Sequence, residues 1–350
     1  MDGVPGRVLP GRRTGPVGAQ TALARGELPC FDLSCFATGA EGSAARESLA
    51  GALDEALSRT GFFLVTGHGI EPGVRRAMFA AAAAFFSEPL EVKRRLAIGN
   101  SPAHRGYVGI GAESLDDTGR GDAKESLDTG GEQGPDHPEV VAGTPLFGPN
   151  QWPRTPGFRE AWERYFAQAV EAAARVQRAL AHALGLTDDD ILAPPGGETM
   201  YHLRFIHYPS QRAQPLAPGQ LGSGVHTDYG SVTLLADDGV GGLQVMTREG
   251  TWLEVGVPED ALVVNLGDLM AIWTNDRWVS NPHRVVNPED TDRYSIPLFV
   301  TPPFNAVISC IGTCLGPGEG PRYRPQKAGD YLLSRLDSTH TYRNPLLRGN

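Results

Sequence analysis

Cysteine is scarce in this chain of 350 residues. The four cysteines, Cys30, Cys35, Cys310 and Cys314, form two close pairs whose spacings are wider than the two-residue spacing of a zinc knuckle. Buried free thiols are therefore favoured over a zinc site. Free thiols fit a reducing compartment, so we expect a cytoplasmic protein.

Long apolar runs and an excess of positive charge are also missing. The longest apolar runs, such as residues 77–86, cover about ten positions, roughly half of what a helix needs to cross a bilayer. Lysine and arginine number 31 against 41 aspartates and glutamates, which gives a net charge of −10. Because nucleic-acid surfaces are built from clustered Lys and Arg, we expect neither a membrane nor a nucleic-acid partner.

Glycine and proline are abundant, with 44 and 28 residues, as expected of short strands and loops. Apolar periodicity and turn signals predict helices over about 43–60, 72–86, 89–96, 157–184 and 328–338. Short strands are predicted at 62–65, 203–208, 225–235, 243–246, 252–255, 261–265, 283–287, 294–301 and 306–309. Their regular spacing after residue 200 indicates a sandwich or barrel, whereas residues 101–149 are expected to be loop-rich.

Three residues in this strand-rich part carry metal-binding side chains. His226 and Asp228 stand two apart in the predicted strand 225–235, so both should point to one face, and His283 begins another strand. Two imidazoles and one carboxylate leave about three of six octahedral positions open, as in non-haem Fe(II) oxygenases. Zinc hydrolases use a similar set but need a general base nearby.

A guanidinium and a hydroxyl follow instead of a general base. Arg293 and Ser295 are two apart in a β-rich run, so both should face inward beside the metal. Arg binds a carboxylate with two parallel hydrogen bonds and keeps its charge at any working pH. This pair therefore suits a dicarboxylate ligand.

These motifs, in this order, resemble the 2-oxoglutarate/Fe(II)-dependent dioxygenases of the isopenicillin N synthase-like family. The resemblance runs from about residue 28 to about residue 342. It includes Phe31-Asp32-Leu33-Ser34, Gly61-Phe62-Phe63, Gly67-His68-Gly69-Ile70, Phe85-Phe86, Arg105-Gly106-Tyr107, Asp122-x-Lys124-Glu125, His207-Tyr208-Pro209, Gly242-Leu243-Gln244-Val245, Asn265-x-Gly267-Asp268 and Thr274-Asn275.

The resemblance implies an α+β, mainly β fold, namely a double-stranded β-helix (jelly-roll) with helices packed on one side. We expect a disordered tail over residues 1–28 and a single catalytic domain over 29–350. Within that domain, a helix-rich part would extend to residue 200, the core with the metal site would span 201–310, and a cap would span 311–350.

The resemblance also implies the chemistry. His226, Asp228 and His283 would hold Fe(II), while Arg293, Ser295 and Tyr208 would hold the far carboxylate of the cosubstrate 2-oxoglutarate. Oxygen would drive oxidative decarboxylation to succinate, coupled to hydroxylation, oxidative cyclisation or desaturation of a small-molecule substrate. His207, next to Tyr208, would then face away from the pocket.

Two other functions stay open on the sequence. The chain could be an Fe(II)/O2 oxidase of the same fold that does not use 2-oxoglutarate, because isopenicillin N synthase also retains the Arg-x-Ser pair. It could also be a non-catalytic jelly-roll that binds a small ligand. In each case we expect a monomer or a weak homo-oligomer.

The substrate pocket is expected to be walled by Arg105, Tyr107, Gln244, Phe299 and residues 331–342. This mixed lining suits a small, polar natural-product molecule, such as an amino acid, peptide or amino sugar, and a role in secondary metabolism or antibiotic biosynthesis. Arg284 is expected to be a structural ion-pair partner. Hydrogen bonds from Asn265, Asp268 and Asn275 are expected to hold the ligands in place, and the histidines expected to be non-ligands are His68, His104, His137, His182, His202 and His340.

Overall fold

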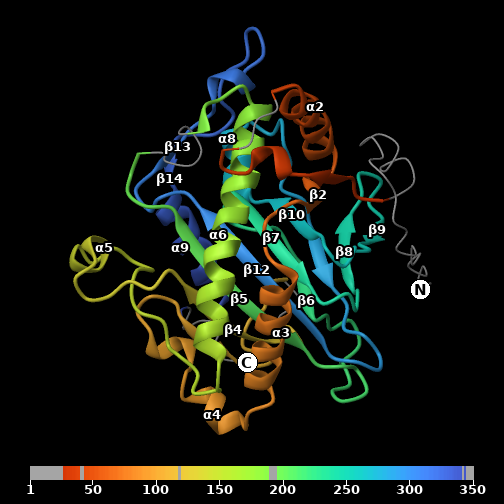
Figure 1. The fold of residues 1–350 in the computed structure, drawn as a ribbon, viewed down its shortest axis with the longest axis vertical. Helices are drawn as coiled ribbons and strands as arrows, with labels where there is room; N and C mark the ends of the chain where they lie inside the picture. Colours follow the sequence, from red (N-terminus) through yellow and green to blue (C-terminus); the bar gives the residue numbers. More distant parts are fainter. Residues whose placement is uncertain (1–26, 40–42, 117–119, 189–194, 341–342, 344–350) are drawn as a thin grey trace.

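A large antiparallel sheet forms the middle of the molecule (Figure 1). The computed structural model describes residues 27–39, 43–116, 120–188, 195–340 and 343. The eight strands of the large sheet run in the order β1 (Cys30–Asp32), β2 (Phe62–Thr66), β10 (Leu262–Leu266), β7 (Val232–Asp237), β12 (Arg293–Thr301), β5 (Met200–Tyr208), β4 (Glu125–Gly130) and β3 (Gly106–Val108). Only the β1–β2 pair within this sheet is parallel.

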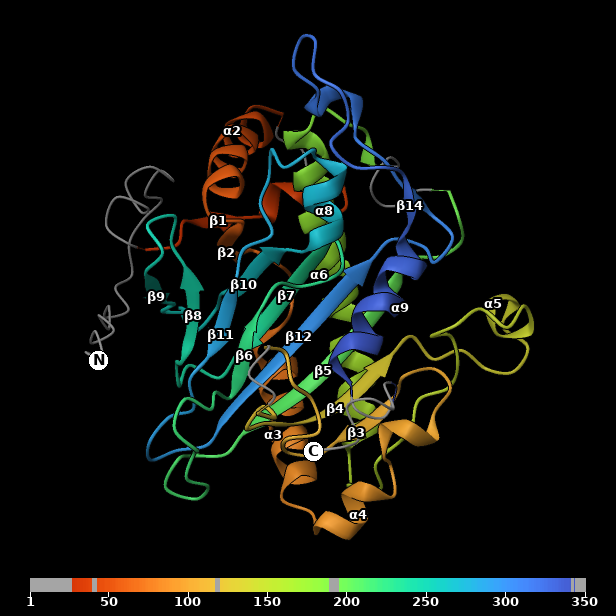
Figure 2. The same cartoon turned by 180° about the vertical axis from the view of Figure 1, so that it is seen from behind.

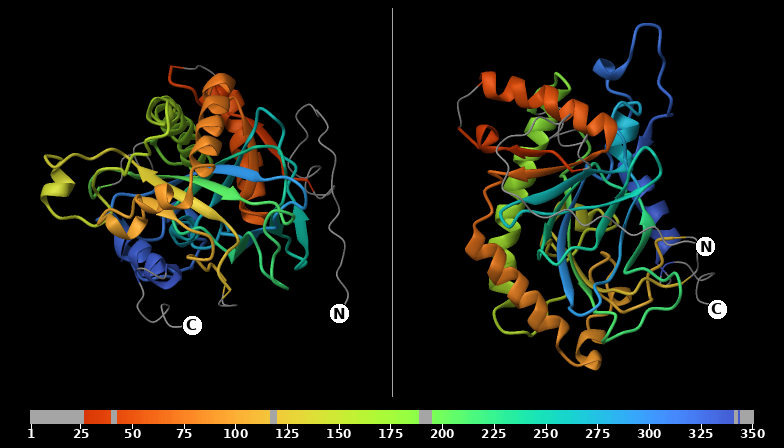
Figure 3. Two further views of the ribbon diagram at one scale, coloured as in Figure 1. Left: turned by 90° about the horizontal axis from the view of Figure 1, so that it is seen from below. Right: turned by 90° about the vertical axis from the view of Figure 1, so that its right-hand side faces the viewer.

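A smaller sheet faces the large one. Its strands run in the order β6 (Ser223–His226), β11 (His283–Val285), β8 (Leu243–Met246) and β9 (Trp252–Glu254), and β13 (Val307–Ile308) pairs separately with β14 (Gln326–Lys327). The described α-helices are α2 (Ser43–Arg59), α3 (Pro72–Phe86), α4 (Leu90–Arg94), α5 (Pro138–Val141), α6 (Phe158–Ala183), α8 (Asp268–Trp273) and α9 (Ala328–Thr339). Helices α3 and α6 cover one face of the large sheet, whereas α9 and the small sheet lie on the other (Figures 2 and 3).

Side-chain alternation along the strands divides the large sheet into a helix-facing and a site-facing surface. On β5, Leu203 and Phe205 are fully buried in the core cluster that includes α6, where Phe205 packs against Phe158 with ring centroids 5.4 Å apart. Their neighbours Arg204 and Tyr208 point to the opposite face. Because successive side chains on a strand alternate, the same strand supplies both the core and the site.

Most predicted elements are confirmed, including the helices at 72–86, 157–184 and 328–338 and the strand at 243–246. Residues 101–149 are not only loops, because they contain β3 and β4, which complete one edge of the large sheet. Helix α8 was also not predicted. The sequence of β4, Glu-Ser-Leu-Asp-Thr-Gly, has no apolar alternation, yet all six residues are buried, because their polar groups bond to one another and to the neighbouring strand.

Two expectations concern the ends of the chain and the membrane. A disordered tail was expected over residues 1–28, and residues 1–26 of it lie outside the described residues. Leu28 is buried in a core cluster with Phe62 and Leu64. Among the helices of the described part, none has the length and apolar character to cross a membrane.

A matched pair of valines tests the assignment of the core. Val232 on β7 is 1% exposed, whereas Val307 on β13 is 58% exposed. We expect Val232→Ala to lower the free energy of unfolding by about 2 kcal/mol, because two buried methyl groups and their contacts are lost. Val307→Ala should change it by less than about 0.5 kcal/mol. Equal losses in urea denaturation would contradict this division.

Candidate active site

His226, Asp228 and His283 converge between the two sheets. His226 ends β6 and lies directly opposite His283, the first residue of β11, with ring centroids 4.2 Å apart. The Oδ1 atom of Asp228 is 3.9 Å from Nε2 of His226 and 3.8 Å from Nε2 of His283. Three potential ligand atoms therefore surround one point.

The single strand predicted over 225–235 is wrong, because β6 ends at His226 and β7 begins at Val232 in the other sheet. Asp228 lies in the connection between them. This connection is fixed by helix α8, whose first N–H groups, those of Asp268 and Leu269, donate to the carbonyls of Asp228 and Gly230. A side chain at Gly230 would collide with the carbonyl of Val300, and one at Gly267 would collide with the carbonyl of Gly230.

Hydrogen bonds fix which atoms of the three side chains can bind a metal ion. The Nδ1 atoms of His226 and His283 lie 2.8 and 3.2 Å from the carbonyls of Gly224 and Asn281, so Nδ1 carries the proton and Nε2 keeps its lone pair. Oδ2 of Asp228 accepts hydrogen bonds from Thr233 (2.5 Å) and Asn265 (2.6 Å), which leaves Oδ1 facing the imidazoles.

The electrostatics agree with a metal-binding role. Burial lowers the pKa of His226 to about 3, so the ring is neutral at physiological pH, as a metal ligand must be. Burial would raise the pKa of Asp228, but the neighbouring histidines and the two hydrogen bonds outweigh it and lower that pKa. Two imidazole nitrogens and one carboxylate oxygen form a donor set that fits Fe(II).

Arg293, Ser295 and Tyr208 line a cavity that also contains the three candidate ligands and has an empty volume of about 550 Å³. Arg293 is fully buried, its Nη2 atom lies 2.6 Å from Oδ2 of Asp237, and its guanidinium carbon lies 4.9 Å from the centre of the Tyr208 ring. Its Nε and Nη1 atoms are buried without a hydrogen-bond partner. Buried donors of this kind call for an acceptor, and a carboxylate supplies it.

His207 lies on the other face of β5, as alternation requires. Its Nδ1 atom is 2.8 Å from Glu125, its Nε2 atom is 3.0 Å from Asp292, and its ring stacks on Tyr294 at 4.8 Å. It takes no part in the cavity that Tyr208 lines.

A second, larger cavity shares His226 and Asp228 with the first and has an empty volume of about 880 Å³. Its wall includes the connection 227–230, Arg105, Phe299 and, from the carboxy-terminal segment, Leu332, Leu336 and His340. Residues 341 and 342 of the expected wall lie outside the described residues. Arg105 and Phe299 thus line the same cavity as His226 and Asp228.

Tyr107 and Gln244, by contrast, are not among the described residues that line either cavity, so their expected place in the pocket wall is wrong. The hydroxyl of Tyr107 donates to Glu125 (2.5 Å) on the helix-facing side of the sheet. Gln244 accepts a hydrogen bond from Arg284 (2.8 Å) on the outer face of the small sheet. Arg284 also lies over the Trp252 ring at 4.1 Å, so its partners are an amide and an indole rather than the expected carboxylate.

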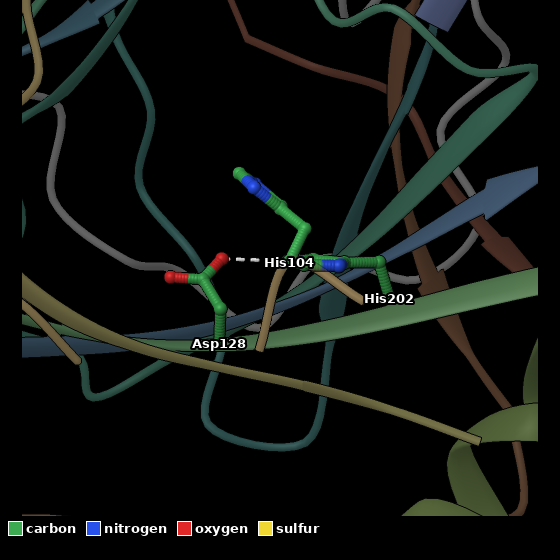
Figure 4. Close-up of side chains that lie close together, drawn as sticks. All are labelled: His104, Asp128 and His202. Carbon is green, nitrogen blue, oxygen red and sulfur yellow. Dashed lines mark hydrogen bonds and ion pairs between the residues drawn. The ribbon is translucent and has the colours of Figure 1, made fainter. Parts of the chain in front are cut away.

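A cluster of His104, Asp128 and His202 was missed (Figure 4), of which the two histidines line the larger cavity. Nε2 of His202 lies 2.6 Å from Oδ1 of Asp128, and the same oxygen accepts a hydrogen bond from Nε of Arg204 (2.6 Å). Arg105 donates to the remaining nitrogen of His202 (3.2 Å). Because N–H groups already occupy these lone pairs, we interpret the cluster as a hydrogen-bond network and not as a metal site. His202 could have been found from its position, two before Arg204 on the same face of β5.

Other expected residues have structural contacts. His68 accepts a hydrogen bond from the N–H of Ile70 (3.0 Å), and its Nε2 atom lies 3.2 Å from the carbonyl of Asp260. Asp268 accepts a hydrogen bond from Tyr331 (2.7 Å), and Asn275 accepts one from the N–H of Arg322 (2.8 Å), so neither contacts a candidate ligand through its side chain. The four cysteines are free as expected, but Cys30 is exposed and the others are half-buried.

Two facing β-sheets that enclose two imidazoles and one carboxylate are typical of non-haem Fe(II) oxygenases. Residues 28–155 match the family described as non-haem dioxygenase in morphine synthesis N-terminal, and residues 199–302 match the 2OG-Fe(II) oxygenase superfamily. The chain belongs to this superfamily. It is therefore a 2-oxoglutarate-dependent dioxygenase that uses Fe(II), 2-oxoglutarate and O2.

Similar proteins span most of the chain. It is 39% identical over 311 residues to the 2-oxoglutarate-Fe(II) type oxidoreductase hxnY of Emericella nidulans, covering 87% of this chain and 88% of that protein. It is 34% identical over 328 residues to the proline hydroxylase buaE of Petromyces alliaceus, covering 90% of this chain and 100% of that protein. The crystal structure of a full-length Neurospora crassa protein in complex with alpha-KG and thymine matches with 30% identity and a TM-score of 0.76, covering 89% and 96% of the two chains. The double-stranded β-helix fold is thereby confirmed.

Replacing a candidate ligand tests the metal site. We expect His226→Ala, Asp228→Ala or His283→Ala to abolish iron binding while leaving the protein folded, because the ligands stand on sheets that have their own core. Iron content and far-UV circular dichroism should be measured on the same samples. Asn265→Ala, which removes one hydrogen bond to Asp228, should weaken iron binding by about ten- to a hundredfold without abolishing it. Full activity of Asp228→Ala with bound iron would exclude this ligand set.

Proposed function

We propose that the two cavities divide the reaction between them. His226, Asp228 and His283 hold Fe(II) between the cavities, because both cavities include His226 and Asp228. The smaller cavity takes 2-oxoglutarate and the larger one takes the primary substrate. Iron bound there would supply the redox chemistry by which O2 converts 2-oxoglutarate to succinate and carbon dioxide and oxidises the substrate.

The buried guanidinium of Arg293 is the observation that carries this assignment. Its Nε and Nη1 atoms have no hydrogen-bond partner, while Nη2 is held by Asp237, so the fork is oriented before any ligand arrives. Arg293 and Ser295 bind the far carboxylate of 2-oxoglutarate, and Tyr208 packs against the same guanidinium. The matches to 2-oxoglutarate-dependent relatives, and not the Arg-x-Ser pair alone, favour this ligand over an oxidase that does not use 2-oxoglutarate.

The primary substrate is a small, polar natural-product molecule that is hydroxylated, cyclised or desaturated. The wall of the larger cavity supports this, because it combines apolar residues such as Leu332 and Phe299 with the polar groups of Arg105 and His202. The related proteins named above include a proline hydroxylase and a thymine-bound protein, which are consistent with a compact polar substrate. Residues 29–350 act as one catalytic domain, working as a monomer or weak homo-oligomer in the cytoplasm.

Arg293→Lys tests the anchor. Lysine keeps the charge but loses the planar fork, so the dissociation constant for 2-oxoglutarate should rise by roughly tenfold or more, as expected for one charge-assisted hydrogen bond. The affinity for the primary substrate should change much less. The measurement is a calorimetric titration of 2-oxoglutarate into both proteins. Equal affinities would show that Arg293 is not the anchor.

The substrate is tested with a metabolite panel. We expect the weak visible absorption band of the anaerobic complex with Fe(II) and 2-oxoglutarate to shift when a suitable polar candidate enters the larger cavity. Succinate formation in air should then be coupled to loss of that candidate. A shift caused only by lipids or flat apolar aromatics would overturn the polar-substrate proposal while leaving the reaction class intact.

A further inference from the structure

Six buried charged side chains of alternating sign form a row in and behind the wall of the larger cavity. Each is at most 8% exposed, and in spatial order they are Arg105, Asp128, Arg204, Glu113, Lys124 and Asp122. Three are cations and three are carboxylates, so their formal charges cancel. Arg105, Arg204 and Glu113 line the larger cavity, Lys124 lines the smaller one, and Asp128 and Asp122 line neither.

His202 joins the first two members of this row. Arg105 donates a hydrogen bond to Nδ1 of His202 (3.2 Å), and Nε2 of His202 donates to Oδ1 of Asp128 (2.6 Å; Figure 4). Arginine has only donors, so this geometry fixes the proton of His202 on Nε2. The imidazole therefore connects the guanidinium of Arg105 to the carboxylate of Asp128.

The rest of the row consists of direct ion pairs. Arg204 donates through Nε to Asp128 (2.6 Å) and through Nη1 to both oxygens of Glu113 (3.1 and 3.2 Å). Lys124 lies 3.0 Å from Glu113 and is also paired with Asp122. Every carboxylate in the row thus contacts a cation, and no charge is left over.

The remaining polar groups in this part of the wall are neutral. His104, His202 and His340 all line the cavity, with the His104 ring 5.6 Å from His202 and 4.8 Å from His340. Burial lowers the pKa of all three, to about 4 in the case of His202. Neutral imidazoles can donate or accept a hydrogen bond, but they do not balance an ionic ligand.

A ligand charge placed against this wall would be buried without a counter-ion. Desolvating an ion is costly unless it gains an oppositely charged partner. Here Arg204 and Glu113 already pair with each other, and the Nη atoms of Arg105 donate to His202 and to backbone carbonyls. The buried Nε of Arg105 has no hydrogen-bond partner and can donate to a neutral acceptor such as an amide carbonyl. A neutral group carries no such cost. The metal ligand Asp228 is the one other charged side chain among the described residues that line this cavity.

We propose that the part of the primary substrate that occupies the larger cavity is electrically neutral and is recognised by hydrogen bonds, as in an amide, an alcohol or a neutral heterocycle. This inference rests on the proposed function, which assigns this cavity to the substrate. Among the polar substrates considered above, this inference favours neutral molecules over zwitterionic amino acids and charged amino sugars.

Three probes of one size test the charge preference. Benzamide, benzoate and benzylammonium share a ring and differ in charge. Each is titrated by calorimetry into protein saturated with Fe(II) and 2-oxoglutarate in the absence of oxygen, so that the Arg293 cavity is already filled. Benzamide should bind at least about tenfold more tightly than either charged probe.

Two substitutions should shift the preference in opposite directions. Glu113→Gln leaves the wall with an excess positive charge, so benzoate should gain about tenfold relative to benzamide. Arg105→Gln leaves an excess negative charge, so benzylammonium should gain similarly. Matched controls are Glu163→Gln and Arg159→Gln, which remove the same charges from an exposed pair on α6 and should leave the ranking unchanged.

The outcomes separate this inference from the proposed function. Saturation with 2-oxoglutarate is measured first, and a folded protein that does not bind it contradicts the proposed function. If 2-oxoglutarate binds but benzamide fails to bind more tightly than both charged probes, the neutral-substrate inference is wrong. Unchanged ranking in folded Glu113→Gln and Arg105→Gln would also overturn it. The wild-type ranking decides alone if neither variant folds.

Discussion

The whole structure depends on placing charged and polar side chains inside a β-structure without leaving them unsatisfied. Strand alternation makes this possible, because β5 and β12 direct one set of side chains into the apolar core under α6 and the other set into the cavities. On the cavity side charged groups have partners of opposite charge, as in the pairs Arg293–Asp237 and Arg204–Glu113. Exceptions among the described residues include the Nε atom of Arg105 and the two free donors of Arg293, and the latter lie where a cosubstrate carboxylate is needed.

Much of the site could be predicted from the sequence because its motifs are local and ordered. His226, Asp228, His283 and the Arg293-x-Ser295 pair are brought together as the sequence indicated. The secondary structure around Asp228 was predicted incorrectly. One strand was expected over residues 225–235, where the chain in fact passes from β6 in the small sheet to β7 in the large sheet. That error has a physical cause: the carbonyls of the connecting residues bond to the start of α8, a contact between segments about 40 residues apart that no local pattern reveals.

The substrate side was harder to predict. His104, His202 and His340 come from three distant segments, and no spacing relates them. Strand β4 was missed because its buried residues are polar, so hydrophobic alternation could not identify it. Arg105 lines the larger cavity, but Tyr107, two residues later, does not. The backbone conformation at Gly106, with φ at 130°, interrupts simple strand alternation between them.

The glycines around the metal ligands have an evolutionary consequence. Gly230 and Gly267 lie so close to neighbouring carbonyls that any side chain there would displace the loop that carries Asp228. By contrast, the part of the larger cavity's wall on helix α9 presents Leu332 and Leu336, apolar side chains with no polar group that must stay paired. Inherited variation can therefore accumulate on the walls that contact the substrate while the metal loop stays fixed. One reaction can in this way be retained through a long series of substrate changes.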